Sequence, residues 1–552
     1  MKSLTIPIIL ILGLALADCQ RAGPGSPDNK KVQDVMIESE PGMIAQIRDE
    51  GYNNSRVMDI AWHLTDVYGP RLANSPSYNE AANWAKEKFI EFGAENVRLH
   101  AFPGFGGMPW KCNFSSISLH SPQYMPLIAY AVPHTRGTKG RVKCTAVYIN
   151  TGDIYQEADL ERFRGKLRSM VVLTQPEAAI RIDNMPGSRR FSGEDLDRMQ
   201  DGELVLRDQA AVTTEAEEKT PNNPKASNEP FSREKIIEFF ENEGVVAVLA
   251  PSGYSVKGAL WGPYDKGIVE MGRVYPVQPG KPKPLPHVIV SAEHYNRVFR
   301  LIERGVDVEM VLEINVTFLE EDLQDYNVIA EIPGTDLKDE IVMLGAHLDA
   351  KSVGTGAADN AAGVAMIMEA LRILKAIDAK PRRTIRVALW GSHEIGRLGS
   401  RAYVKENFYD PGTNTIMPGH EKLSVYFNSD YYGRICGLYL HGNELVTPLF
   451  EQWIEPFRDL GMTHLIPGNS GGSDHMTFID ADLPGFKWVN DPIEYFSTIH
   501  HTNMDLYDRI VEDDLKQAAV INAGWAYLAA MHEDLIPRTP KQKENDLIWH
   551  DP

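Results

Sequence analysis

The sequence predicts an α/β protein, in which a mostly parallel or mixed sheet is flanked by helices and a second, smaller α/β domain is inserted. From Tyr326 onward, short continuous apolar runs alternate with longer amphipathic segments. A run such as 341–346 is apolar at every position, as in strands that are buried on both faces. Between residues 120 and 317, strand-like and helix-like segments alternate more loosely, which predicts the smaller domain. A chain of 552 residues is long enough for both.

The N-terminal half is predicted in three parts. Residues 36–115 are expected to be helical with loops, and 78–92 carries its apolar residues at the spacing of one helix face. The smaller domain is expected to contain strands at 141–149, 167–173, 245–250 and 288–290 and helices at 233–242 and 293–304. Residues 176–231 are polar and are interpreted as a partly disordered surface excursion.

The C-terminal half has the more regular pattern. Strands are predicted at 341–346, 384–389 and 423–427, and helices at 361–377, 400–405, 445–458 and 515–531. In the predicted helix 361–377, the apolar residues form one stripe along the helix. The expected organisation is a signal peptide at 1–17, an N-terminal part of the main domain at 18–119, an inserted domain at 120–317, the main catalytic part at 318–535 and a tail at 536–552.

Composition and the N-terminus restrict the function and the compartment. The net charge of −20 disfavours nucleic-acid binding. Lys2 precedes an apolar run that ends in Ala15-Leu16-Ala17, which predicts a cleaved signal peptide and a secreted or periplasmic protein. The run is too short to span a bilayer, and no later run is long enough. A lipid anchor at Cys19 is disfavoured because Asp18 stands where a small residue is expected.

The four cysteines contain no C-x-x-C pair, so a metal would have to use histidines and carboxylates. Pairing of Cys112 with Cys144 stays open. Histidines and carboxylates gather where the predicted strands end: His347 and Asp349, Asp359 before a helix, His393 and Glu394, Asp430, and His500 and His501 ahead of the last helix. In α/β sheets, ligands bind at the carboxyl ends of the strands.

Five of these residues form a candidate metal site. Two imidazoles and three carboxylates suit zinc: His347, Asp359, Glu394, Asp430 and His501. Five ligands exceed the need of one tetrahedral ion, whereas a shared carboxylate would give two ions about 3.5–4 Å apart. Each residue alone also has a purely structural interpretation, such as a helix cap for Asp359 or a packed core histidine for His501. Their common position at the strand ends favours the site.

The chain resembles the co-catalytic, two-zinc exopeptidase family of bacterial aminopeptidases and plasma glutamate carboxypeptidase. The segments that carry the resemblance are 64–72 (LTDVYGPRL), 326–332 (YNVIAEI), 345–349 (GAHLD), 356–363 (GAADNAAG), 390–400 (WGSHEIGRLGS), Ser429-Asp430, Ser473-Asp474-His475 and 500–505 (HHTNMD). Residues 120–317 resemble the protease-associated domain inserted in many members.

The resemblance implies a role for each candidate. His347 and Asp430 would bind one Zn²⁺, Glu394 and His501 the second, with Asp359 bridging two ions per chain. Asp349 would hold His347, a water between the ions would be the nucleophile, and His500 would hydrogen-bond the oxyanion. The expected activity is hydrolysis of short peptides, as an aminopeptidase, carboxypeptidase or dipeptidase. That choice stays open, as does a homodimer.

The family pattern is broken at one position. Where members carry Glu-Glu, this chain reads His393-Glu394, so the general-base Glu is replaced. Imidazole accepts protons near neutrality, but nearby metal cations disfavour its protonated form. His393 is therefore expected to act as the base, to ligate a metal, or to leave the site weak or silent. The rival hypothesis is a metal-binding homologue without catalysis. A third, glutaminyl cyclisation, needs only one zinc and is disfavoured by the five ligands.

Overall fold

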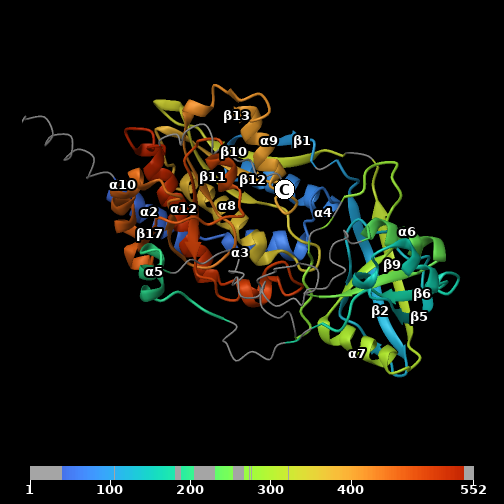
Figure 1. The fold of residues 1–552 in the computed structure, drawn as a ribbon. Helices are drawn as coiled ribbons and strands as arrows, with labels where there is room; N and C mark the ends of the chain where they lie inside the picture. Colours follow the sequence, from blue (N-terminus) through green and yellow to red (C-terminus); the bar gives the residue numbers. More distant parts are fainter. Residues whose placement is uncertain are drawn as a thin grey trace, which may run out of the picture. The chain divides into compact units, whose positions relative to one another are not determined.

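The computed structural model describes residues 40–539 apart from residues 105, 179, 181–187, 204–230, 253–265, 273, 275 and 321–322. The predicted signal peptide (1–17), Cys19 and the part of the predicted tail from residue 540 lie outside the described residues. From Ile44 onward the described residues form one compact unit (Figure 1). No helix among the described residues has the length and apolar character needed to cross a membrane.

The first of two eight-stranded sheets carries the strands predicted from Tyr326 onward. Its order is β1 (Glu95–Phe102), β10 (Asp325–Ile332), β12 (Arg383–Trp390), β11 (Leu337–His347), β15 (Leu423–Asn428), β18 (Gly485–Asn490), β16 (Ile435–Tyr439) and β17 (His464–Ile466). Strands β12, β11, β15 and β18 run parallel, whereas β10 and β16 are antiparallel to the strands beside them in this central group. The sheet is therefore mixed, and its parallel strands end at a common edge.

Helices cover both faces of this sheet. They are α2 (Glu40–Asn53), α3 (Val57–Trp62), α4 (Pro76–Glu91), α8 (Ala362–Ala376), α9 (Leu398–Asn407), α10 (Thr447–Ile454), α11 (His475–Ile479) and α12 (Glu512–Met531). Ile341 and Met343 of β11 pack in one buried cluster with residues of α9 and α11. Val342 and Leu344 are fully buried as well and alternate to the other face, where α8 and α12 contact β11. Burial on both faces explains the continuous apolar run.

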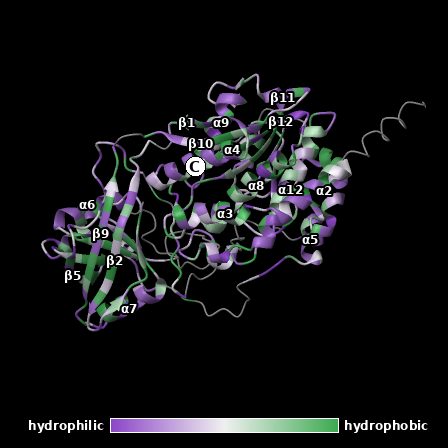
Figure 2. Cartoon of the chain, turned by 180° about the vertical axis from the view of Figure 1, so that it is seen from behind, coloured by the Kyte–Doolittle hydropathy of each residue, from purple (hydrophilic) through white to green (hydrophobic). Residues whose placement is uncertain are grey.

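The second sheet is formed by strands between Trp110 and Phe318. Its order is β3 (Met125–Pro126), β2 (Trp110–Ser121), β9 (Glu309–Phe318), β5 (Val142–Tyr148), β6 (Met170–Leu173), β7 (Ala247–Pro251), β8 (His287–Val290) and β4 (Ala129–Ala131). Helices α6 (Arg233–Glu243) and α7 (Ala292–Glu303) lie in the same stretch of the sequence as these strands. Figure 2 shows hydrophobic and hydrophilic bands along β2 and β9. The predicted boundary at residue 120 falls inside β2.

The expectation of helices and loops over 36–115 is wrong in its second half. Residues 95–102 form β1 and residues 110–121 form β2, which pair with β10 and β9, respectively. These partners lie about 200 residues further along the chain, so a local helical pattern did not reveal them. Strands β13 (Tyr409–Asp410) and β14 (Thr415–Ile416) form a separate small hairpin.

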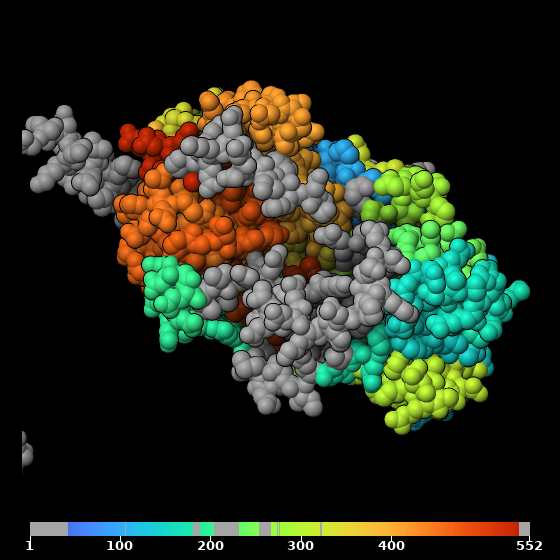
Figure 3. All heavy atoms as spheres, in the orientation of Figure 1, coloured from blue at the N-terminus to red at the C-terminus, as the bar shows by residue number. Residues whose placement is uncertain are grey.

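The predicted polar excursion contains an ordered element. Residues Gly193–Gln200 form helix α5, which Ser192 caps by accepting a hydrogen bond from the Asp195 N–H. Leu196 and Met199 pack with Ile466 of β17. In Figure 3 the α5 residues (green) lie against the orange segment of the chain that contains β17. The cysteines within the described residues are all free, so Cys112 and Cys144 are not paired.

Candidate metal centre and active site

Five side chains lie together where the parallel strands of the first sheet end. They are His347 at the end of β11, Glu394 in the loop after β12, Asp430 two residues after β15, Asp359 in the turn before α8, and His501 in the loop before α12. His347, Asp359 and Asp430 are buried. Residues up to 154 positions apart in the sequence thus meet at the carboxyl ends of the strands, where α/β sheets bind their ligands.

The carboxylate of Asp359 lies between two imidazoles. Its Oδ1 is 3.2 Å from Nε2 of His347, and its Oδ2 is 3.3 Å from Nε2 of His501. Each imidazole has a second carboxylate: Asp430 Oδ1 lies 3.3 Å from His347 Nε2, and Glu394 Oε2 lies 3.1 Å from His501 Nε2. The five residues therefore form two donor groups that share Asp359.

The donor set fits divalent cations such as zinc. Burial by itself lowers the pKa of His501, but Glu394 and Asp359 raise it to about 9. A proton on this ring thus occupies the position where a cation would neutralise the carboxylates. Glu394 Oε1 is buried without a hydrogen-bond partner in the part of the chain that the structure describes, which is costly unless a ligand reaches it. Nitrogen and carboxylate donors in this number are those that zinc prefers.

The turn geometry fixes the tautomer of His347. Its Nδ1 donates to the main-chain carbonyl of Asp349 at 3.0 Å, which leaves the Nε2 lone pair facing Asp359. The Asp349 carboxylate, whose contact with His347 stays a prediction, lies 3.7 Å from Nδ1 of that ring and accepts the N–H groups of His393 at 3.0 Å and Glu394 at 2.9 Å. Asp349 therefore ties the end of β11 to the loop after β12.

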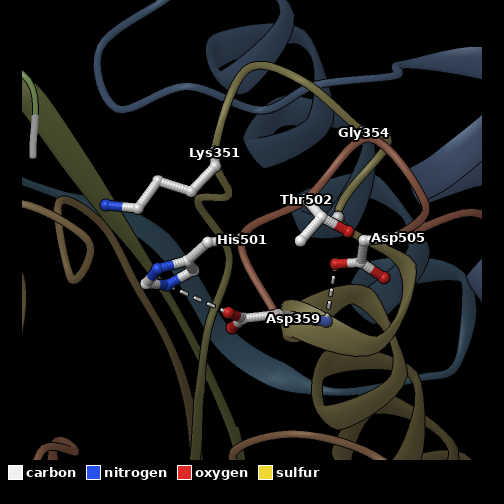
Figure 4. A pocket seen from close by; sticks show the side chains of 7 residues that line it. Lys351, Gly354, Asp359, His501, Thr502 and Asp505 are labelled. Atoms are coloured by element: carbon white, nitrogen blue, oxygen red, sulfur yellow. Dashed lines mark hydrogen bonds and ion pairs between the residues drawn. The ribbon is translucent and has the colours of Figure 1, made fainter. Parts of the chain in front are cut away.

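Two further residues hold the turn that carries Asp359. The guanidinium of Arg71 is fully buried and donates to the carbonyls of Thr355 and Gly356 at 2.8 and 2.9 Å. Asp505 accepts the N–H of Ala358 at 2.6 Å and that of Asp359 at 3.1 Å (Figure 4). Burial and the nearby Asp359 raise the pKa of Asp505 to about 7. Both residues lie inside the segments that carried the family resemblance, but their roles were not predicted.

His393 pairs with a carboxylate from a distant segment. Its Nδ1 lies 2.8 Å from Asp474 Oδ2, and its ring stacks on that of His347 with centroids 3.9 Å apart. Burial and His347 lower the pKa of His393, but Asp474 outweighs them and raises it. Asp474 is fully buried and also accepts the hydroxyl of Ser400. Sequence spacing gave Asp474 no role beyond shaping its loop.

His500, the predicted oxyanion donor, lies on the other side of the cluster. Its ring stacks on His501 with centroids 3.6 Å apart, and its Nε2 is 3.9 Å from Asp359 Oδ2. Burial and the neighbouring His501 lower the pKa of His500 to about 3. The ring is therefore neutral at neutral pH and can donate one N–H without adding a charge.

Comparison with solved structures supports the fold. A peptidase M28 precursor from Shewanella amazonensis superposes with a TM-score of 0.61 at 23% identity, over 91% of this chain and 99% of that chain. A zinc aminopeptidase from Bacillus subtilis superposes with a TM-score of 0.51 at 18% identity, over 87% of this chain and 95% of that chain. These similarities confirm the predicted α/β class.

Sequence comparison finds similarity to known peptidases over part of the chain. Carboxypeptidase Q from Bos taurus is 26% identical over 262 residues, which cover 48% of this chain and 53% of that protein, so the chain spans about half the length of the curated relatives that it matches. Residues 327–526, which contain all five candidate ligands, match the model of peptidase family M28. This match confirms, over residues 327–526, the resemblance that the motifs predicted.

Proposed function

We propose that this protein is a zinc-dependent exopeptidase that hydrolyses short peptides at a site with two Zn²⁺ ions. The observation that carries the proposal is the carboxylate of Asp359, whose two oxygens face two imidazoles that each have a further carboxylate. His347 and Asp430 would hold one ion and Glu394 and His501 the other, with Asp359 shared. The match to a peptidase family supports this reaction class.

The side chains around the metals would carry the protons. When bound, zinc supplies Lewis acidity, which polarises a carbonyl and lowers the pKa of water toward about 7. The Nδ1–H of His393 would donate to Asp474, so that Nε2 takes the proton of the attacking water and returns it to the leaving amine nitrogen. Asp474 would stabilise the imidazolium that forms in between. Neutral His500 would donate its N–H to the developing oxyanion.

The same geometry allows His393 a second role. His347, His393 and Asp430 each place one ligand atom within 4.8 Å of the others, so His393 can also ligate a metal. A histidine that donates one ring nitrogen to a carboxylate is the usual form of a metal ligand. In that role His393 would exclude water and give the weak or silent homologue.

The test is hydrolysis of a panel of dipeptides and amino-acid amides by the zinc-reconstituted protein. We expect cleavage that Asp359→Asn abolishes and that the exposed control Asp339→Asn retains. A rate loss of about 10²–10⁴ in His393→Gln, with the zinc content unchanged, is expected of a lost general base. If the natural protein cleaves nothing and His393→Glu creates activity, the silent homologue is correct. A zinc content near one per chain would contradict the two-metal site.

Export and the domain division are part of the proposal. We infer that residues 1–17 are removed on export, because a charged start, a short apolar run and Ala15-Leu16-Ala17 follow the signal-peptide pattern. Sequencing the N-terminus of protein secreted by an expression host should find it at Asp18, and an intact Met1 would contradict export. We also infer that the segment of the second sheet is a domain inserted between residues 18–119 and 318–535.

A further inference from the structure

A segment of the second-sheet region pairs with the loop that carries His501. The N–H of Asn503 donates to the carbonyl of Val269 at 3.0 Å, and the N–H of Met271 donates to the carbonyl of His501 at 2.9 Å. Glu270, between these two residues, faces Thr502 in an antiparallel bridge. The pairing fixes Glu270 beside a candidate metal ligand, although the two are 231 residues apart in the sequence.

The carboxylate of Glu270 is buried and unsatisfied. The residue is 6% exposed, and its Oε2 has no hydrogen-bond partner among the described residues. Burial raises the pKa of Glu270, and the charges of His501 and Lys351 oppose that shift. A buried carboxylate oxygen without a partner is unfavourable. Such a group is stabilised when a cation reaches it.

Lys351, whose charge acts on Glu270, is paired with another carboxylate. Lys351 Nζ lies 3.3 Å from Glu394 Oε2 and 3.2 Å from the Glu394 carbonyl. A further positive group, such as the free amino group of a peptide, would suit the unsatisfied oxygen of Glu270.

We propose that Glu270 binds the α-ammonium group of the substrate and so directs the site to the N-terminal peptide bond. The inference rests on the proposed peptidase function, which it deepens to an aminopeptidase or an N-terminally directed dipeptidase. The α-nitrogen is two bonds from the scissile carbonyl, so its binding group must lie close to the metal ligands. Glu270 meets this requirement because its backbone is paired with the His501 loop.

The test compares free and acetylated amines. The wild-type protein should cleave L-leucyl-L-alanine with a KM about 10- to 100-fold below that for its N-acetyl derivative, the range expected of a hydrogen bond to a charged group. Glu270→Gln should raise the KM for the free dipeptide by that factor and leave the N-acetyl peptide unchanged. Glu238→Gln, an exposed glutamate in α6, should change neither.

A binding experiment separates this inference from the peptidase proposal. Calorimetry should show that the zinc-loaded protein binds L-leucine more tightly than N-acetyl-L-leucine, and that Glu270→Gln removes the difference. If this holds but no peptide is cleaved, the peptidase proposal fails and the amine site stands. If peptides are cleaved and acetylation has no effect on either measurement, the amine site is wrong. A preference for N-acetyl-lysyl peptides would place a side-chain ammonium there and would also overturn it.

Discussion

The buried guanidinium of Arg71 should be the main stabiliser of the turn that carries Asp359. It donates to five main-chain carbonyls, those of Leu64, Gly69, Leu348, Thr355 and Gly356, at 2.7–3.2 Å. Burial lowers its pKa to about 10, so it remains charged at neutral pH. Arg71→Met would remove this donor from all five carbonyls, of which Gly356 would keep the N–H of Ala361, and each buried group left unsatisfied costs about 1–3 kcal/mol. Because the substitution also removes a desolvated charge, we expect a net loss of about 3–5 kcal/mol.

The assay is urea unfolding of the zinc-loaded protein, followed by zinc competition with a chelator. Arg71→Met should lower both the free energy of unfolding and the zinc affinity, because the carbonyls of Thr355 and Gly356 lie directly before the turn that carries Asp359. Arg71→Lys keeps the charge but has only three donors, so its loss should be smaller. Arg141→Met, at an exposed position, is the control. A loss below about 1 kcal/mol in Arg71→Met, or a larger loss in Arg71→Lys, would refute the reasoning.

Three further outcomes are expected. Gly345→Ala should destabilise the first sheet by about 1–3 kcal/mol, because the added methyl group would overlap the Tyr426 hydroxyl. Gly468→Ala is the control, since Gly468 has open space around it, and equal unfolding temperatures of the two variants would contradict this reasoning. Burial lowers the pKa of His134 to about 4, so below pH 6.5 protons bind the unfolded chain more readily than the folded one and stability falls by about 1.4 kcal/mol per pH unit. His134→Asn should therefore lose about 2 kcal/mol less between pH 7 and pH 5 than the wild type, and an unchanged acid sensitivity in urea titrations would disprove it. Chelation of zinc should lower the unfolding temperature and readdition should restore it, because without the metal only two imidazoles face the three carboxylates of the site. An unfolding temperature that does not respond to the chelator would argue against bound metal.

Local sequence patterns predicted the elements of the main sheet well. The apolar run at 341–346 lies in β11, the stripe at 361–377 became α8, and the run at 384–389 lies in β12. These elements are buried on both faces or along one stripe, so the spacing of apolar residues in the sequence predicts whether each is a strand or a helix. The strands β1 and β2 were missed because their stability comes from pairing with β10 and β9, which the local sequence does not contain.

The candidate ligands were also accessible from sequence. Parallel strands bring their carboxyl ends to one edge, so histidines and carboxylates that follow successive strands must meet there. The motif match then named the family, and the structure adds the distances between Asp359 and its two imidazoles. The replacement at His393 was visible in the sequence as well, but its consequence was not.

The sequence by itself therefore indicated the fold class, the resemblance to a peptidase family and the residues at the strand ends. Tertiary structure decided which groups surround them: Asp474 on His393, Arg71 on the Asp359 turn, and Glu270 beside His501. These partners are 81, 288 and 231 residues apart along the chain. Periodicity reports only neighbours within a helix or strand, whereas hydrogen bonds and ion pairs between distant segments depend on how the loops fold over the sheet edge. That is why the sequence could indicate which side chains lie at the strand ends but not which distant groups contact them.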